Sequence, residues 1–109
     1  MNDHTPAAVA IYATFPDMTT AESIGRGLVE AGLIACANLL PEMRSIYRWG
    51  GAIEEAAEVV GILKTRPDRV EAVIDEIERR HPYDTPAIVV LPIAKGARRY
   101  LDWITAETA

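Results

Sequence analysis

Two strand-like segments meet at Gly50-Gly51, and their length constrains the fold more than any other feature of the chain. Residues 33 to 48 have the pattern of a long strand interrupted near Pro41, and a second strand-like segment continues to Thr65. A Gly-Gly pair between two such segments is typical of a hairpin turn. About fifteen residues extend roughly 50 Å at ~3.3 Å per residue, far beyond the usual strand. We therefore predict a long hairpin whose outer half overhangs the domain.

The chain before the hairpin predicts one strand and one helix. Residues 8 to 15 have strand character and end at Pro16. Thr19 followed by Glu22 fits a capping box at the start of a helix, and Gly32 is expected to end it. Its apolar stripe is formed by Ile24, Leu28 and Ala31.

The chain after the hairpin repeats this pattern. Pro67 suits the first turn of a second helix, and Pro82 disfavours helical geometry at His81, where we expect the helix to end. Residues 87 to 93 are continuously apolar and predict a further strand. A short last helix is expected around residues 100 to 104. The stripe of the second helix is formed by Val70, Val73, Ile74 and Ile77.

The resulting order is βαββαβ with an added helix, which predicts an α+β fold. In this ferredoxin-like sandwich both crossover helices lie on one face of a four-stranded antiparallel sheet. The length of 109 residues fits one domain. We assign residues 1–7 to an N-terminal tail and residues 8–109 to a single domain with a long hairpin and an extra C-terminal helix.

The strands predict that the sheet is apolar on both faces. Val59 and Leu63 point to one side and Val60 and Ile62 to the other, because side chains alternate along a strand. Two helices cover one side only, and a terminal helix of about ten residues, roughly 15 Å long, is too short to cover the other. An exposed, overhanging apolar hairpin is also an aggregation hazard. We therefore expect a homo-oligomer.

Charge and composition exclude several classes of protein. Sixteen acidic against eleven basic residues give a net charge of -5, which repels nucleic acid. No apolar run approaches the ~20 residues of a membrane span, and Met1 to Pro6 lack the features of a secretory signal. We expect a cytoplasmic protein with no membrane partner. Cys36 is the only cysteine and, in an apolar strand, is expected to behave as a small hydrophobe.

The segment His81-Pro82-Tyr83-Asp84-Thr85-Pro86 concentrates polar groups between two prolines. His81 is the candidate metal ligand, since neutral imidazole binds copper, zinc and nickel; the alternative is a structural histidine bonded to backbone or carboxylate. Asp84 either orients this imidazole or caps the turn. Tyr83 is expected to pack against a neighbouring subunit.

The hairpin carries further candidates. Lys64 and Glu58 share a strand face but lie about 20 Å apart along it, so we expect no contact between them within one chain. Lys64 either binds an anion in a cleft between subunits or forms an intersubunit salt bridge. Tyr47 and Trp49, near the tip, suit aromatic anchors of an interface.

The two histidines of the chain limit its metal and catalytic chemistry. They are too few for a His-rich metal centre, and a catalytic triad has little support. Asn2-Asp3-His4 would form an amino-terminal copper motif only if Met1 were removed, and Asn is too large for efficient removal.

Several segments, in order, resemble the CutA divalent-cation tolerance proteins over about residues 8 to 105. They are Leu33–Asn38, Pro41, Ser45–Gly51, Glu58, Leu63–Thr65, His81–Pro86 and Tyr100–Ile104. The resemblance implies a tight trimer in which long hairpins pair between subunits, similar in architecture to the PII signalling proteins, with a link to copper tolerance and no firm enzymatic activity. One family member is associated with copper bound by a cysteine and a His-His pair; the corresponding positions here are Ala13, Arg80 and His81, so only His81 matches.

The leading hypothesis is a non-enzymatic homotrimer that contributes to divalent-metal response and binds metal weakly near His81, or acts on a protein partner that the sequence does not identify. No cofactor is required, and a divalent metal such as copper is the expected ligand. The alternative is a PII-like module whose inter-subunit cleft, with Lys64, Arg80, Tyr83 and Asp84 as candidate residues, binds a small anionic metabolite or nucleotide. A third alternative is a scaffold whose task is assembly.

Overall fold

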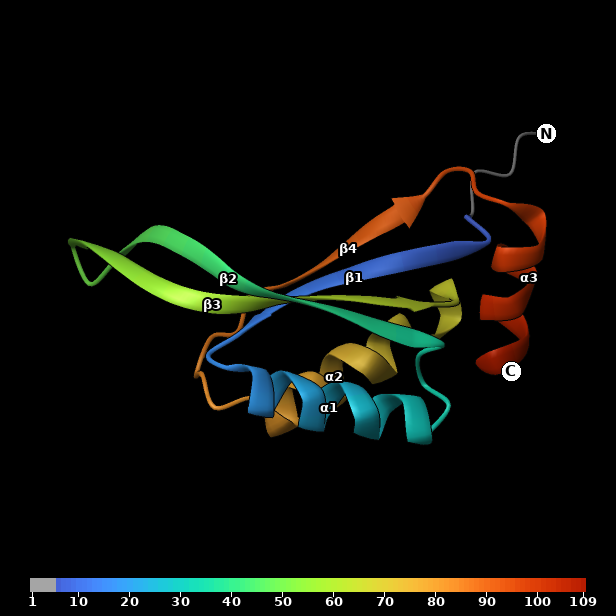
Figure 1. Ribbon diagram of the computed structural model, residues 1–109, viewed down its shortest axis with the longest axis horizontal. Helices are drawn as coiled ribbons and strands as arrows, with labels where there is room; N and C mark the ends of the chain where they lie inside the picture. The colour runs from blue at the N-terminus through green and yellow to red at the C-terminus, as the bar shows by residue number, and fades with distance from the viewer. Residues whose placement is uncertain (1–5) are drawn as a thin grey trace.

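The computed structural model describes residues 6–109 and has the predicted βαββαβ order with an added helix (Figure 1). The four strands form one antiparallel sheet in the order β2-β3-β1-β4, and α1 and α2 lie on the same side of it. The ferredoxin-like prediction is therefore confirmed. The elements are β1 (Ala8–Phe15), α1 (Met18–Glu30), β2 (Cys36–Trp49), β3 (Ala52–Thr65), the 3₁₀ turn η1 (Pro67–Arg69), α2 (Val70–Arg80), β4 (Ile88–Ile93) and α3 (Arg98–Glu107).

The main core lies between the helices and one face of the sheet. Apolar side chains of β1, β3, α1 and α2 interlock there because the inward residues of each strand meet one stripe of each helix. Its members include Ile11, Phe15, Ile24, Leu28, Leu63, Val73 and Ile77, all of them buried. This packing fixes α2 against the sheet and so places the His81 loop at the end of β1.

The capping prediction for α1 is wrong in its residues. Asp17, and not Thr19, is the N-cap, and its carboxylate accepts a hydrogen bond of 2.7 Å from the backbone N–H of Thr20. Asp17 precedes the first helical residue, which is the position where a side-chain oxygen can reach the free N–H groups. The helix also ends at Glu30, which leaves Ala31 exposed, and Gly32 follows in the left-handed region with φ 72°.

The long hairpin is confirmed, although β2 begins at Cys36 and not at residue 33. A β-bulge interrupts it between Leu40 and Met43, so that two residues, Pro41 and Glu42, stand opposite one on β3. Glu42 adopts a left-handed conformation with φ 65°. The interruption predicted at Pro41 is thus a bulge that keeps the strand continuous and shifts its register.

The outer half of the hairpin overhangs the body of the domain (Figure 1). On β3, pairing with β1 begins only at Val59, so residues 52 to 58 pair with β2 alone. The longest extent of the domain is 47 Å, as expected when one hairpin sets the length. Near the tip, Ile46 is 71% and Trp49 59% exposed.

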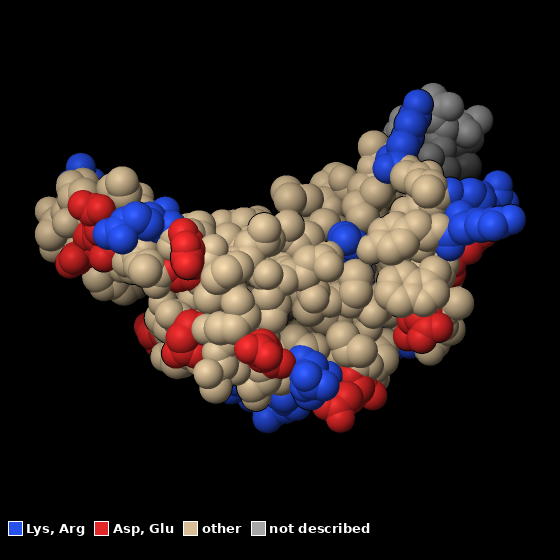
Figure 2. All heavy atoms as spheres, in the orientation of Figure 1, with Lys and Arg blue, Asp and Glu red and all other residues tan. Residues whose placement is uncertain are grey.

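The face of the sheet opposite the helices is apolar and open. On this face Leu40, Val89 and Leu91 are each about half exposed, at 48%, 52% and 51%. Figure 2 shows a largely uncharged surface between the hairpin and α3, with charged side chains gathered at the hairpin tip, over the helices and around α3. We call this surface, lined by Tyr12, Leu40, Val60, Ile62, Val89 and Leu91, the open face.

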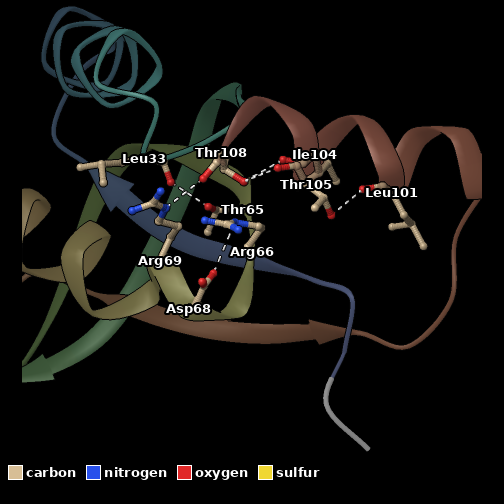
Figure 3. Close-up of polar contacts among 9 residues, drawn as sticks. All are labelled: Leu33, Thr65, Arg66, Asp68, Arg69, Leu101, Ile104, Thr105 and Thr108. Carbon is tan, nitrogen blue, oxygen red and sulfur yellow. Dashed lines mark hydrogen bonds and ion pairs between the residues drawn. The ribbon is translucent and has the colours of Figure 1, made fainter.

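The C-terminal helix packs against one end of the sheet (Figure 3). Ile104 is fully buried in a second small core with Ala8 and Ala35. The Nε of Arg69, in η1, donates a hydrogen bond of 2.9 Å to the backbone carbonyl of Thr108. The predicted extra helix is therefore an integral part of the domain. No helix within residues 6–109 is long and apolar enough to cross a membrane.

Candidate functional site

His81 lies at the junction between α2 and the loop that leads to β4. It is the C-cap of α2, in extended conformation, as expected for a residue that precedes proline. The side chain is 7% exposed and stacks on Phe15, with ring centroids 5.3 Å apart. The core of the domain therefore determines the orientation of the imidazole.

Both nitrogens of the imidazole have hydrogen-bond partners. Nε2 lies 2.7 Å from the backbone carbonyl oxygen of Thr14, and Nδ1 accepts a bond of 3.1 Å from the backbone N–H of Tyr83. Because Nδ1 accepts, the proton belongs on Nε2, which donates to Thr14. This is the structural alternative for His81: the imidazole links β1 to the loop. A metal ion at Nδ1 would have to displace the N–H of Tyr83.

A pocket of about 520 Å³ opens next to this loop, between the open face and the hairpin. Glu58, a residue that is only 8% exposed, contributes its carboxylate to the lining. Glu58 accepts hydrogen bonds from the Ser45 hydroxyl at 2.5 Å and from the Tyr83 hydroxyl at 3.1 Å. The aromatic wall of the pocket includes Tyr12, Tyr47 and Trp49.

The phenol of Tyr83 is held in its neutral form. Burial raises its pKa from 10.0 to about 12, and the hydrogen bond to Glu58 and the negative charge of that carboxylate act in the same direction. A neutral phenol can donate to Glu58, whereas a phenolate would repel it. Tyr83 is therefore a hydrogen-bond donor in this pocket and is not set up as a base.

Lys64 occupies the opposite end of the open face. Its Nζ donates to Asn38 Oδ1 at 2.8 Å and to the Tyr100 hydroxyl at 3.0 Å, and it lies 5.3 Å from the centre of the Tyr100 ring. These partners are all uncharged. As predicted, Lys64 and Glu58 do not contact each other within the chain.

The structure does not gather the four predicted cleft residues into one site of a single chain. Arg80 lies on the helix side of the sheet, where its Nε is 2.8 Å from a carboxylate oxygen of Glu76 and its guanidinium packs over Gly27. Asp84 is exposed in the loop, and Lys64 lies at the far end of the sheet. A cleft that contains all four would need contributions from more than one subunit.

Ser45 is the site residue that sequence reasoning missed. The β-bulge after Leu40 turns Ser45 and Tyr47 toward the face that carries Glu58, and no spacing rule predicts a one-residue shift of register. Tyr47 and Trp49 line the same pocket, and their predicted role as interface anchors stays a prediction.

The structure also bears on the metal hypothesis. Among residues 6–109, no three His, Cys, Asp or Glu side chains are grouped so that they could hold a metal ion. The segment Asn2-Asp3-His4 lies outside the described residues. Any metal bound by the described part of one subunit therefore has few protein ligands.

Comparison with known proteins decides the family. The family model described as CutA1 divalent ion tolerance protein matches residues 9–107. This chain belongs to the CutA1 family. The match runs from the second residue of β1 to the last residue of α3.

Individual members of the CutA1 family are similar in sequence and in structure. A CutA homolog from Xenopus laevis is 43% identical over 95 residues, which cover 87% of this chain but 63% of the frog protein. The divalent-cation tolerance protein CutA of Pectobacterium atrosepticum is 39% identical over 92% of this chain and 91% of its own length. The solved structure of the periplasmic divalent cation tolerance protein CutA from Archaeoglobus fulgidus superposes with a TM-score of 0.91 at 39% identity, over 94% of this chain and 99% of that one.

Membership of the CutA1 family supports a role in tolerance of divalent cations. The family is not known as an enzyme family.

Proposed function

We propose that this chain acts in tolerance of divalent cations, copper among them, as a non-enzymatic cytoplasmic homotrimer that binds metal weakly at clefts between its subunits. Membership of the CutA1 family over residues 9–107 carries the first part of this proposal. The assembly and the metal site rest on physical arguments from the open face and from the His81 loop.

The open face supports the homotrimer. Leu40, Val89 and Leu91 form an apolar strip on a sheet whose other side is already covered. The overhanging hairpin adds Ile46 and Trp49 to the exposed apolar surface. Contiguous apolar surface of this kind marks an interaction site, and a second copy of the chain offers a surface of matching character.

The His81 loop supports metal binding that is weak. Nε2 is committed to the Thr14 carbonyl, so Nδ1 is the imidazole nitrogen that a metal ion would use. The ion must displace the N–H of Tyr83 from Nδ1, at a cost in free energy. Asp84, exposed in the same loop, would supply a carboxylate oxygen, and residues of a neighbouring subunit would complete the cleft.

Calorimetry with Cu²⁺ and Zn²⁺ tests the metal site. We expect Asp84→Asn to weaken binding at least tenfold without disturbing the fold, because Asp84 is exposed. His81→Ala is expected to abolish binding at the cleft. His4→Ala is the control, since it removes the other histidine of the chain. Binding that persists in the first two variants and disappears in His4→Ala would refute a site at the loop.

A second candidate function is the binding of a small anionic ligand in the inter-subunit cleft, as in a PII-like module. Lys64 favours it, because the Nζ partners given above are all uncharged. A thermal-shift screen of nucleotides and carboxylates tests this candidate. A ligand at a hundred times its Kd stabilises the folded state by roughly 2.7 kcal/mol, and the shift should disappear in Lys64→Gln.

A further inference from the structure

Glu58 and Lys64 lie at opposite ends of the open face, with apolar side chains between them. Successive side chains of a strand point to opposite faces, so every second residue of β3 lies on the same side. On the open face these residues are Glu58, Val60, Ile62 and Lys64. Lys64 lies six positions after Glu58, roughly 20 Å along the strand. The face therefore has an acidic end beside the hairpin and a basic end beside α3.

Glu58 has no counter-ion within the described part of the chain. The residue is 8% exposed, and its carboxylate accepts hydrogen bonds from the hydroxyls of Ser45 and Tyr83. A carboxylate offers about four acceptor positions, and these two bonds leave others free toward the pocket. A buried charge is costly unless an opposite charge compensates it, so the pocket is suited to a cation.

Lys64 has no acidic partner within the described part of the chain. None of the ion pairs among residues 6–109 includes it, although its Nζ is held in place by Asn38 and Tyr100. An ammonium group has three donors, and these two bonds leave one of them free. The oriented ammonium group is suited to an anion that approaches from outside the chain.

We propose that Lys64 of one subunit binds Glu58 of the next, so that the neighbouring copy completes the Glu58 pocket. This inference rests on the proposed homotrimer and names the contact that orients its subunits. In a closed ring each subunit offers its basic end to one neighbour and its acidic end to the other. The apolar side chains of the open face are buried in the same interface. The anion that Lys64 binds is a carboxylate of the partner.

Electrostatic complementarity of this kind gives orientation more than affinity. Apolar burial alone would allow the open faces to meet in several directions. An ammonium at one end and a carboxylate at the other allow only head-to-tail contacts to satisfy both charges, since like ends repel. The pair therefore explains how an apolar face can specify one assembly.

A double-mutant cycle on trimer dissociation tests the pair, with Glu58→Gln, Lys64→Gln and the double variant in the full chain. Within one chain these residues are too far apart to couple, and effects of such distant sites are additive. We expect each single variant to raise the dissociation constant of the trimer at least tenfold. The double variant should dissociate no more readily than the single variant with the larger effect. Fold-changes that multiply in the double variant would overturn the proposal.

Controls separate this inference from the proposed homotrimer. Glu71→Gln, on α2, and Lys95→Gln, in the loop between β4 and α3, remove exposed charges and are expected to leave dissociation unchanged. A monomeric wild type would refute the homotrimer itself, whereas a stable wild-type trimer with independent effects at Glu58 and Lys64 would refute the pair alone.

A zero-length carbodiimide cross-link provides a test that needs no variant. The reagent joins a lysine amine to a carboxylate in direct contact, with loss of water, and forms an amide. We expect a peptide linking Lys64 to Glu58 in the band of covalent dimers, because the two residues are about 20 Å apart within one chain. Covalent dimers linked through other residues, without this peptide, would contradict the proposal.

Discussion

At the scale of single residues, His81 shows how one side chain can join two elements. Its ring connects the end of β1, through the Thr14 carbonyl, to the backbone N–H of Tyr83 in the loop between α2 and β4. Sequence reasoning identified the residue and both alternatives for it, but only the packing on Phe15 shows that the ring is buried. Burial depends on where α2 meets the sheet, which no local spacing contains.

Replacement of His81 by alanine is expected to destabilise the fold by about 3 kcal/mol, since it leaves a cavity beside Phe15 and a buried carbonyl without a donor. Chemical denaturation measures the change. Asp84→Ala, in the same loop but exposed, serves as the control and should stay within about 0.5 kcal/mol of the wild type. An equal, small effect of both substitutions would show that His81 has no structural role.

Tyr83 is expected to titrate at about pH 12, two pH units above an ordinary tyrosine. Because its folded pKa lies above its unfolded value, the phenol stabilises the fold below pH 10, and this contribution is lost as the pH rises through about 12. Tyrosinate absorbance measures the titration. Glu58→Gln should lower this pKa and Tyr83→Phe should remove the step, whereas titration of all four tyrosines near 10 would contradict the geometry.

At the scale of elements, strand and helix order could be read from the sequence because apolar periods and prolines set it locally. The ends of the helices were harder to predict. Asp17 and Thr19 are both good capping residues, and the choice between them depends on where the chain leaves β1. The bulge at Pro41-Glu42 was visible as an interruption, but its consequence for Ser45 was not, because a register shift acts on every later residue of the strand.

The cap of α1 predicts a specific pH dependence. The hydrogen bonds from Thr20 hold the pKa of Asp17 below its usual 3.8, so the carboxylate stabilises the helix above its unfolded pKa and loses this effect as the pH falls through the lower folded value. Asp17→Ala should lower the Tm at pH 7. Asp17→Asn should keep most of the stabilisation from the cap, because Asn can also cap a helix. In the Asn variant the Tm should fall less steeply at acidic pH, because the contribution of Asp17 to this fall is gone. An unchanged dependence of the Tm on pH would show that other carboxylates cause the acid sensitivity.

At the scale of the whole molecule, the apolar face opposite the helices is the feature that a single chain leaves unexplained. The sequence alone predicts this face, because Val60 and Ile62 alternate with the core residues of β3. The positions of Glu58 and Lys64 on one strand face followed from the same alternation, but the partners of Lys64 did not, because its hydrogen bonds with Asn38 and Tyr100 depend on how α3 packs. Assembly is therefore the central claim, and metal binding at the clefts depends on it.

The mass of the wild-type protein in solution tests that claim most directly. Sedimentation equilibrium or light scattering at micromolar concentration should give three times the chain mass of 11.9 kDa, with no change on moderate dilution. A single species of 11.9 kDa under the same conditions would contradict the homotrimer. It would also leave the open face, the hairpin and the Lys64–Glu58 pair without the partner proposed for them.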